Sequence, residues 1–176
     1  PYQYSWSVGS STDSTISDVA AGTYVAFITD ANGCQDTIEL TFEEPSVVVV
    51  KVEDVSHNLC FGDSQGSITL SASGGTQPYV TYFIESSAGI ISSQVSNLFV
   101  NLLAGNYDLW VEDSLGCFSS KIIGEKIGEP GQIELTSTIT SLSCFESNDG
   151  SIYLNFSGGV APYKYISNIT GIDAVN

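Results

Sequence analysis

The sequence lacks methionine and arginine and carries very little positive charge. Four lysines stand against 20 acidic residues, so the formal net charge is −16 over 176 residues. A balance of this kind repels phosphate backbones and anionic lipid headgroups. We therefore expect no nucleic-acid partner and no electrostatic attachment to a membrane surface.

Long apolar runs are also missing. The longest strictly apolar run has four residues, as in Val47–Val50, whereas a membrane-spanning helix needs about 20. The sequence opens with no methionine, charged leader or signal-peptide core, so we expect an internal piece of a longer protein and no membrane insertion. A hydrophobic content of 42% is nevertheless enough for globular cores.

Groups that could carry catalysis are scarce. The one histidine, His57, is not repeated, because Ser141 stands at the matching position of the next repeat. The four cysteines show no C-x-x-C spacing of the kind that binds zinc. The recurring carboxylates, Asp30 and Asp113, fit turn-forming residues that cap their own backbone. No glycine-rich phosphate loop is present. We predict that the segment is not an enzyme and has no cofactor, calcium being the exception considered below.

Two blocks of sequence recur with nearly constant spacing. The first begins with Cys-Phe, passes through Gly-Ser-Ile and Gly-Gly, and ends in Pro-Tyr. The second joins Ala-Gly-x-Tyr to Asp-x-x-Gly-Cys. The offset is 84 residues from Cys60 to Cys144 and 83 from Cys34 to Cys117. The matching residues are Cys60–Ile68 with Cys144–Ile152, Pro78-Tyr79 with Pro162-Tyr163, Gly22 and Tyr24 with Gly105 and Tyr107, and Gly33 with Gly116.

This spacing divides the chain into one complete repeat with a half-repeat on either side. We predict the second half of one repeat in residues 1–45, a complete repeat in 46–130 and the first half of another in 131–176. Only Cys60 and Cys117 then share a complete repeat, so we expect them to form a disulfide. Cys34 and Cys144 would be unpaired within the segment, and four buried or cytoplasmic free thiols are the alternative.

The complete repeat has the pattern of short strands. Ile68, Leu70 and Ala72 alternate with polar residues, as do Tyr107, Leu109 and Val111, which is typical of strands with one buried face. Further strands are expected at 47–52, 78–84 and 90–100. Gly, Asn, Asp and Ser clusters separate these stretches. We predict an all-β protein made of tandem immunoglobulin-like β-sandwich repeats of about 84 residues.

Four glycines and two tyrosines recur as structural positions. The Ala-Gly-x-Tyr segments at Gly22–Tyr24 and Gly105–Tyr107 resemble a tyrosine corner, in which a Tyr hydroxyl bonds back to upstream backbone. Gly33 and Gly116 end tight turns and are expected to supply a positive φ.

The ordered set of these motifs resembles the SprB-type repeat of very long surface proteins in Bacteroidetes, including the gliding-motility adhesin that gives the family its name. Two departures occur: six extra residues lie between Pro78 and Cys117 compared with the first half-repeat, and Glu146 stands where Gly62 is found. Both changes fall in expected loops.

The resemblance implies export by the type IX secretion system and an extracellular location at the cell surface. The implied partners are neighbouring repeats, the secretion and gliding machinery, and a surface polysaccharide or substratum. The triplets that contain Thr37 and Ser114 resemble the Asp-Ser/Thr-apolar pattern used for O-glycosylation in these bacteria.

Two further sites are open at this point. Calcium could bind the acidic loops at Asp63 and Asp149, and a solvated acidic surface is the alternative explanation of these residues. Trp110, between Asp108 and Glu112, could stack on a sugar ring or pack across its sheet.

Two functions fit the sequence. The first is an extended adhesive filament for surface attachment and gliding motility, which we favour. The alternative is a spacer or stalk in a secreted carbohydrate-active or other enzyme.

Overall fold

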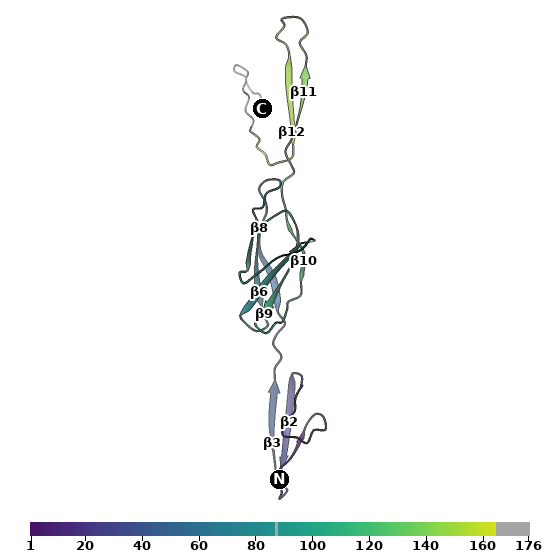
Figure 1. Cartoon of the computed structure of the whole chain (residues 1–176), viewed down its shortest axis with the longest axis vertical. Coiled ribbons are helices and arrows are strands. Elements are labelled where there is room, and N and C mark those ends of the chain that lie inside the picture. Colours follow the sequence, from purple (N-terminus) through teal and green to yellow (C-terminus); the bar gives the residue numbers. More distant parts are fainter. Residues whose placement is uncertain (87, 165–176) are drawn as a thin grey trace. The chain divides into compact units, whose positions relative to one another are not determined.

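A computed structural model describes residues 1–86 and 88–164, and this part of the chain is all-β. The predicted fold class is thereby confirmed (Figure 1). No helix in the described residues is long and apolar enough to cross a membrane. The strands are β1 (Gln3–Trp6), β2 (Gly22–Thr29), β3 (Gln35–Phe42), β4 (Val49–Ser56), β5 (Gly66–Ser73), β6 (Tyr79–Ser86), β7 (Gly89–Gln94), β8 (Leu98–Leu102), β9 (Gly105–Asp113), β10 (Ile122–Ile127), β11 (Glu134–Thr140) and β12 (Ser151–Ser157).

The chain divides into two compact units, Pro1–Val47 and Val48–Asn176. The first unit is an antiparallel sheet in the order β1-β2-β3. The division of the chain into repeats after residues 45 and 130 stays a prediction. Opposite residues of an antiparallel pair share a face, so the pairs Tyr24–Leu40 and Ala26–Ile38 place apolar side chains on one face of this sheet.

The second unit contains a β-sandwich made by β4 to β10. One sheet has the order β10-β9-β6-β7 and the other β4-β5-β8. The predicted alternation is seen directly: Ile68, Leu70, Leu109 and Val111 are fully buried between the sheets, while the residues between them are less buried. The core also contains Val48, Val50, Tyr82, Ile84, Phe99, Leu102, Tyr107 and Ile127.

The expected strand at 90–100 is two strands in different sheets. β7 pairs with β6, whereas β8 pairs with β5. Side-chain amides hold the corner between them: Gln94 Nε2 donates to the Leu98 carbonyl at 2.7 Å, and Asn97 Nδ2 donates to the Leu70 carbonyl at 2.7 Å. These bonds replace ladder bonds where the chain changes sheet, and the hydrophobic pattern alone gives no sign of the change.

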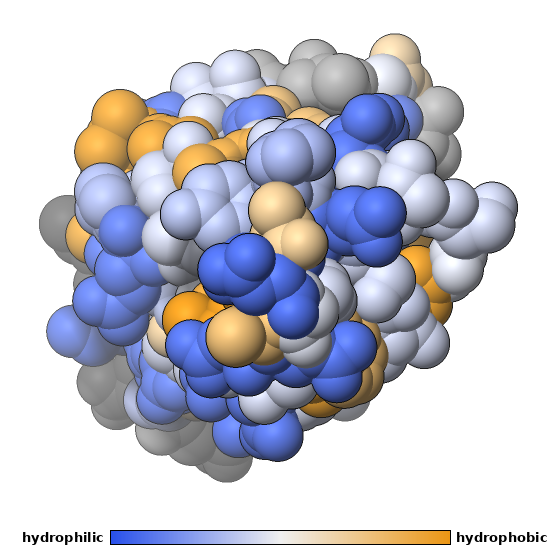
Figure 2. Space-filling view, turned by 90° about the horizontal axis from the view of Figure 1, so that it is seen from below, coloured by the Kyte–Doolittle hydropathy of each residue, from blue (hydrophilic) through white to orange (hydrophobic). Residues whose placement is uncertain are grey.

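A third element is the hairpin of β11 and β12, in which seven residue pairs run from Glu134–Ser157 to Thr140–Ser151. Leu135 lies opposite Phe156, and Ile139 lies opposite Ile152, so one face of the hairpin is apolar. Hydrophobic side chains also reach the molecular surface among polar ones in the view of Figure 2.

The first prediction concerns the core of the sandwich. Leu109→Ala should lower the free energy of unfolding by about 2–5 kcal/mol, because it removes buried contacts and leaves a cavity. Leu115→Ala is the control, since Leu115 is 69% exposed. Urea unfolding followed by Trp110 fluorescence in a Trp6→Phe background measures both, and equal small effects would contradict the assigned core.

Candidate functional site

Both tyrosines of the repeated Ala-Gly-x-Tyr motif bond to backbone four residues upstream. The Tyr107 hydroxyl donates to the Leu103 carbonyl and the Tyr24 hydroxyl to the Ala20 carbonyl, each at 2.8 Å. Tyr107 is almost fully buried, and burial raises the pKa of its phenol. The ring fills the core while the hydroxyl satisfies a loop carbonyl, which is the geometry of a tyrosine corner. Gly22 and Gly105 begin the strands that carry these tyrosines.

A second recurring tyrosine has the same function but was not singled out from the sequence. The Tyr79 hydroxyl donates to the Gly74 carbonyl at 2.9 Å, and the Tyr163 hydroxyl donates to the Gly158 carbonyl. The recurring Gly-Gly-x-x-Pro-Tyr spacing is the signal that could have identified it. In each copy, the tyrosine fixes the glycine pair that precedes it.

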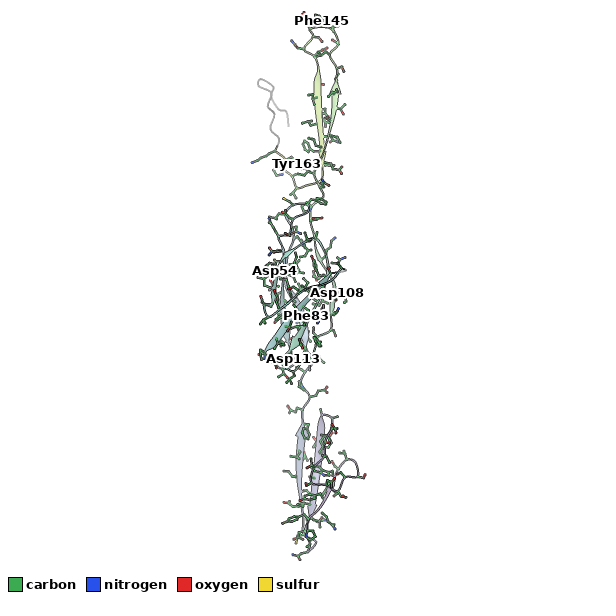
Figure 3. All side chains as sticks on the ribbon, viewed as in Figure 1. Asp54, Phe83, Asp108, Asp113, Phe145 and Tyr163 are labelled. Atoms are coloured by element: carbon green, nitrogen blue, oxygen red, sulfur yellow. The ribbon has the colours of Figure 1, made fainter. Side chains whose placement is uncertain are left out.

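Asp113 organises one end of the sandwich (Figure 3). It is 1% exposed, and its carboxylate accepts N–H bonds from Thr76 at 2.8 Å, Cys117 at 2.9 Å and Leu115 at 3.0 Å. These bonds, that from Thr76 first, lower the pKa of Asp113 below its ordinary value. One side chain therefore joins the loop before β6 to the turn after β9.

The glycine pair fits closely around this carboxylate. Gly75 has a φ of +58°, and a Cβ there would lie 2.5 Å from Val48 Cγ2 and 2.7 Å from Asp113 Oδ2. Both the left-handed conformation and the missing side chain are therefore needed. Gly159 repeats this arrangement, with a φ of +59° and a Cβ position 2.5 Å from Ile133 Cγ1.

The matching turn in the first unit is built in the same way. Asp30 Oδ1 accepts N–H bonds from Asn32 and Cys34, both at 2.8 Å. Gly33 and Gly116 have φ values of +84° and +80°, as tight turns of this kind require. The repeated carboxylates of Asp30 and Asp113 thus accept hydrogen bonds from backbone N–H groups.

The opposite end of the sandwich depends on Asn58, which the sequence did not single out. This buried amide accepts N–H bonds from Gln65 and Gly66, both at 2.7 Å, and donates to the Leu102 carbonyl at 3.2 Å. Its neighbour His57 accepts an N–H bond from Gly128 at 3.2 Å through Nδ1. Asn58 positions the loop that contains Cys60 and Asp63, and His57 joins the start of that loop to Gly128.

The structure does not confirm the predicted disulfide between Cys60 and Cys117. All four cysteines, Cys34, Cys60, Cys117 and Cys144, are exposed free thiols. Cys117 follows Asp113 at one end of β9, whereas the loop of Cys60 bonds to Gly128 and Glu129, beside the Gly105 end of that strand. Eight strand steps separate the two ends, about 27 Å, and a disulfide needs Cα atoms within about 7 Å.

The two acidic residues considered for calcium lie in different loops. Asp63 is half-buried between β4 and β5, and its N–H donates to the Cys60 carbonyl at 3.3 Å. Asp149 accepts from the Ser143 N–H at 3.1 Å and the Ser147 hydroxyl at 2.7 Å, and these bonds lower its pKa. Residues 1–86 and 88–164 contain no cluster of three or more His, Cys, Asp or Glu suited to a metal. Calcium binding stays a prediction.

Trp110 packs across its sheet. Its ring is stacked on Phe83, with centroids 5.0 Å apart and planes 1° from parallel, and Lys121 Nζ lies 4.0 Å from the Trp110 centroid. Lys121 also pairs with Glu85 at 2.7 Å. Phe83 of the adjacent strand β6 and Lys121 therefore both contact the Trp110 ring. These contacts favour packing across the sheet over stacking on a sugar.

The two residues proposed for O-glycosylation are in unlike places. Thr37 is exposed in β3. Ser114 is exposed in the turn after β9, where its hydroxyl donates to the Thr76 carbonyl at 3.0 Å. Modification of either residue stays a prediction.

Fold and recurring side chains together define an all-β tandem-repeat protein. The family model described as SprB repeat matches residues 52–87 and 136–171, two segments with the same 84-residue offset as Cys60 and Cys144. Over these two segments, which make up less than half of its length, the chain is similar to the SprB repeat. None of the curated proteins matches it. The SprB repeat is a structural repeat, and proteins that contain it are typically found at the cell surface or outside the cell in Bacteroidetes.

Acid should weaken the sandwich through Asp113. Because its pKa is lowered on folding, the carboxylate stabilises the fold above the unfolded value of about 3.9, and this contribution is lost as the pH falls through the folded pKa. Asp113→Asn should therefore reduce the free energy of unfolding at pH 7 and flatten its decline between about pH 5 and pH 2. Urea titrations at several pH values measure this.

The control for that experiment is Asp54→Asn, which removes one exposed carboxylate from β4 of the same sandwich. It should keep the pH dependence of the parent chain. A decline of the same steepness in Asp113→Asn would contradict the role assigned to Asp113.

The thiol geometry gives a separate prediction. Alkylation of the folded chain with iodoacetamide at neutral pH, after removal of reductant, should modify all four cysteines, because all four are exposed. Intact mass measures the number of adducts. Two cysteines that react only after reduction would indicate a bridge and contradict the placement of Cys60 and Cys117.

Proposed function

We propose that this chain is a non-enzymatic repeat segment of a large cell-surface adhesin of a Bacteroidetes bacterium, exported by type IX secretion and used for surface attachment and gliding motility. The observation that carries the proposal is that the recurring polar side chains form hydrogen bonds with backbone. The carboxylates of Asp30 and Asp113 and the hydroxyls of Tyr24 and Tyr107 each bond to backbone of their own repeat.

Repetition of backbone-bonding groups favours a structural function. A side chain selected for catalysis needs free lone pairs or protons that face a substrate. Asp113 instead has three backbone N–H donors on its two oxygens. What is preserved from repeat to repeat is thus the capacity to fold, as a tandem array requires.

The charge of the chain supports the same proposal. A net charge of −16 with only four lysines keeps neighbouring acidic surfaces apart and a long array soluble. We propose that neighbouring repeats, the secretion and gliding machinery, and a surface polysaccharide or substratum are the partners of this segment.

The test uses beads coated with antibody against residues 46–130 and added to living, unpermeabilised cells of the source bacterium. Beads should bind and travel along the cell, as microscopy would record. The control is the same antibody absorbed beforehand with the purified chain, which should leave the beads unbound.

Two outcomes contradict parts of the proposal. Beads that bind and stay still would exclude gliding and support a static adhesin or an enzyme stalk. Beads that fail to bind, with the epitope present in the culture medium, would exclude cell-surface display and support a spacer in a secreted protein.

A further inference from the structure

The chain enters the β-sandwich at one end and leaves it at the other. Val48, which precedes β4, lies beside Asp113, because a Cβ on Gly75 would be 2.5 Å from Val48 Cγ2 and 2.7 Å from Asp113 Oδ2. Ile127 ends β10 at the opposite end of β9, where it pairs with Gly105. A force that pulls on the two ends of the chain is therefore applied to opposite ends of the sandwich.

The first and last strands of the sandwich run in the same direction. β4 starts beside Asp113, where β9 ends, and β10 is antiparallel to β9. The residues that follow β4, His57 and Asn58, accordingly meet Gly128, the residue that follows β10. Tension along the chain would pull these two segments past each other, because one is drawn toward the entry of the sandwich and the other toward its exit.

Three hydrogen bonds join these segments directly. The Asn58 N–H donates to the Gly128 carbonyl at 3.0 Å, and the Gly128 N–H donates to His57 Nδ1 at 3.2 Å. The Gly62 N–H donates to Glu129 Oε2 at 2.7 Å, and a hydrogen bond to a charged group is stronger than one between neutral groups. We call these three bonds the exit clamp.

The exit clamp closes a loop in the chain. Residues 63–127, which contain β5 to β10, lie between its two sides. While the clamp holds, tension passes along the backbone of β4, through His57 and Asn58, and across the clamp to Gly128. A strand is already extended, at about 3.3 Å per residue, so β4 transmits this tension without lengthening. The ladders among β5 to β10 then lie outside the path of the force.

Without the clamp, the tension would fall on a short ladder. β10 is joined to β9 by four residue pairs, and the register shifts between Ile122 and Glu125. β4 is joined to β5 by seven residue pairs. β10 is therefore the more weakly paired of the two terminal strands, and the clamp lies immediately after it, between β10 and the applied force.

We propose that the exit clamp is the mechanical clamp of the repeat: it ties the exit of the sandwich to the end of β4 under tension and keeps β10 from being pulled out of its sheet. The Glu-Pro pair that contains Glu129 recurs as Glu44-Pro45 after β3, so the carboxylate is present at the end of the first repeat as well. The proposal rests on the proposed function only for the source of the tension, since an adhesin is pulled when it holds a surface.

Optical tweezers applied to the whole chain test the proposal. Handles are attached to the two termini in a reducing buffer, and the lifetime of the folded sandwich is measured at constant force. Its opening is recognised by a gain in length of about 240 Å, the extended length of residues 48–129 less the span of the sandwich. The double variant His57→Ala/Glu129→Ala removes two clamp bonds and should shorten this lifetime at least about tenfold.

The native thiols supply a control for the direction of the force. Cys60 and Cys117 are both exposed, so handles can be attached to them in a chain that also carries Cys34→Ser and Cys144→Ser. The chain between these handles contains neither His57 nor the residues after β10. The double variant should then shorten the lifetime much less than it does when the termini are pulled.

Matched variants separate the clamp from a general loss of stability. Lys121→Ala removes the ion pair with Glu85 and the contact with Trp110, away from the clamp, and should leave the lifetime under terminal force unchanged. Glu129→Gln keeps an acceptor for the Gly62 N–H and should give a longer lifetime than Glu129→Ala. Urea unfolding shows whether each variant is folded. If the double variant is not, Glu129→Ala alone, which changes an exposed side chain, provides the same comparison.

Two results would overturn the proposal. One is a lifetime under terminal force that the clamp variants leave unchanged. The other is equal shortening with both pairs of handles, which would identify a general loss of stability. Neither result concerns display or movement on the cell surface, which the antibody-coated beads test separately.

Discussion

The structure depends on one constraint: a two-sided sheet with one apolar face cannot hide that face by itself. In the sandwich, β9 and β5 meet this constraint together, and Leu109 and Ile68 lose all contact with solvent between them. In the sheet of β1, β2 and β3, Tyr24 is buried while Ile38, Leu40 and Phe42 are exposed.

Polar side chains decide where each sheet ends and how the loops cross. Asp113 joins two loops at one end, and Asn58 joins a loop to two strands at the other. Each side chain forms hydrogen bonds with several backbone groups at once, because buried polar groups need hydrogen-bond partners. Loops that would otherwise leave orphaned N–H groups become rigid connections, so the sandwich keeps both ends ordered without a covalent bridge.

Much of this architecture could be predicted from the sequence, because alternation and repetition are local signals. The pattern at Ile68–Ala72 and Tyr107–Val111 identified the buried strands, and Ala-Gly-x-Tyr identified the tyrosine corners. Asn58 and the sheet change between β7 and β8 were missed, because their partners lie far away in sequence, at Leu102 and Leu70. The expected disulfide is not confirmed, and shared membership of a repeat says nothing about which end of a strand a cysteine occupies.

The position of the thiols has a mechanical consequence. With no covalent link between Cys60 and Cys117, a pulling force that opens the sandwich meets no internal stop. The roughly 80 residues from Val48 to Glu129 would then extend to about 270 Å of chain at about 3.4 Å per residue. A long series of such repeats would behave as an extensible tether, one in which a sudden load is absorbed by the unravelling of single modules while the remaining modules stay folded.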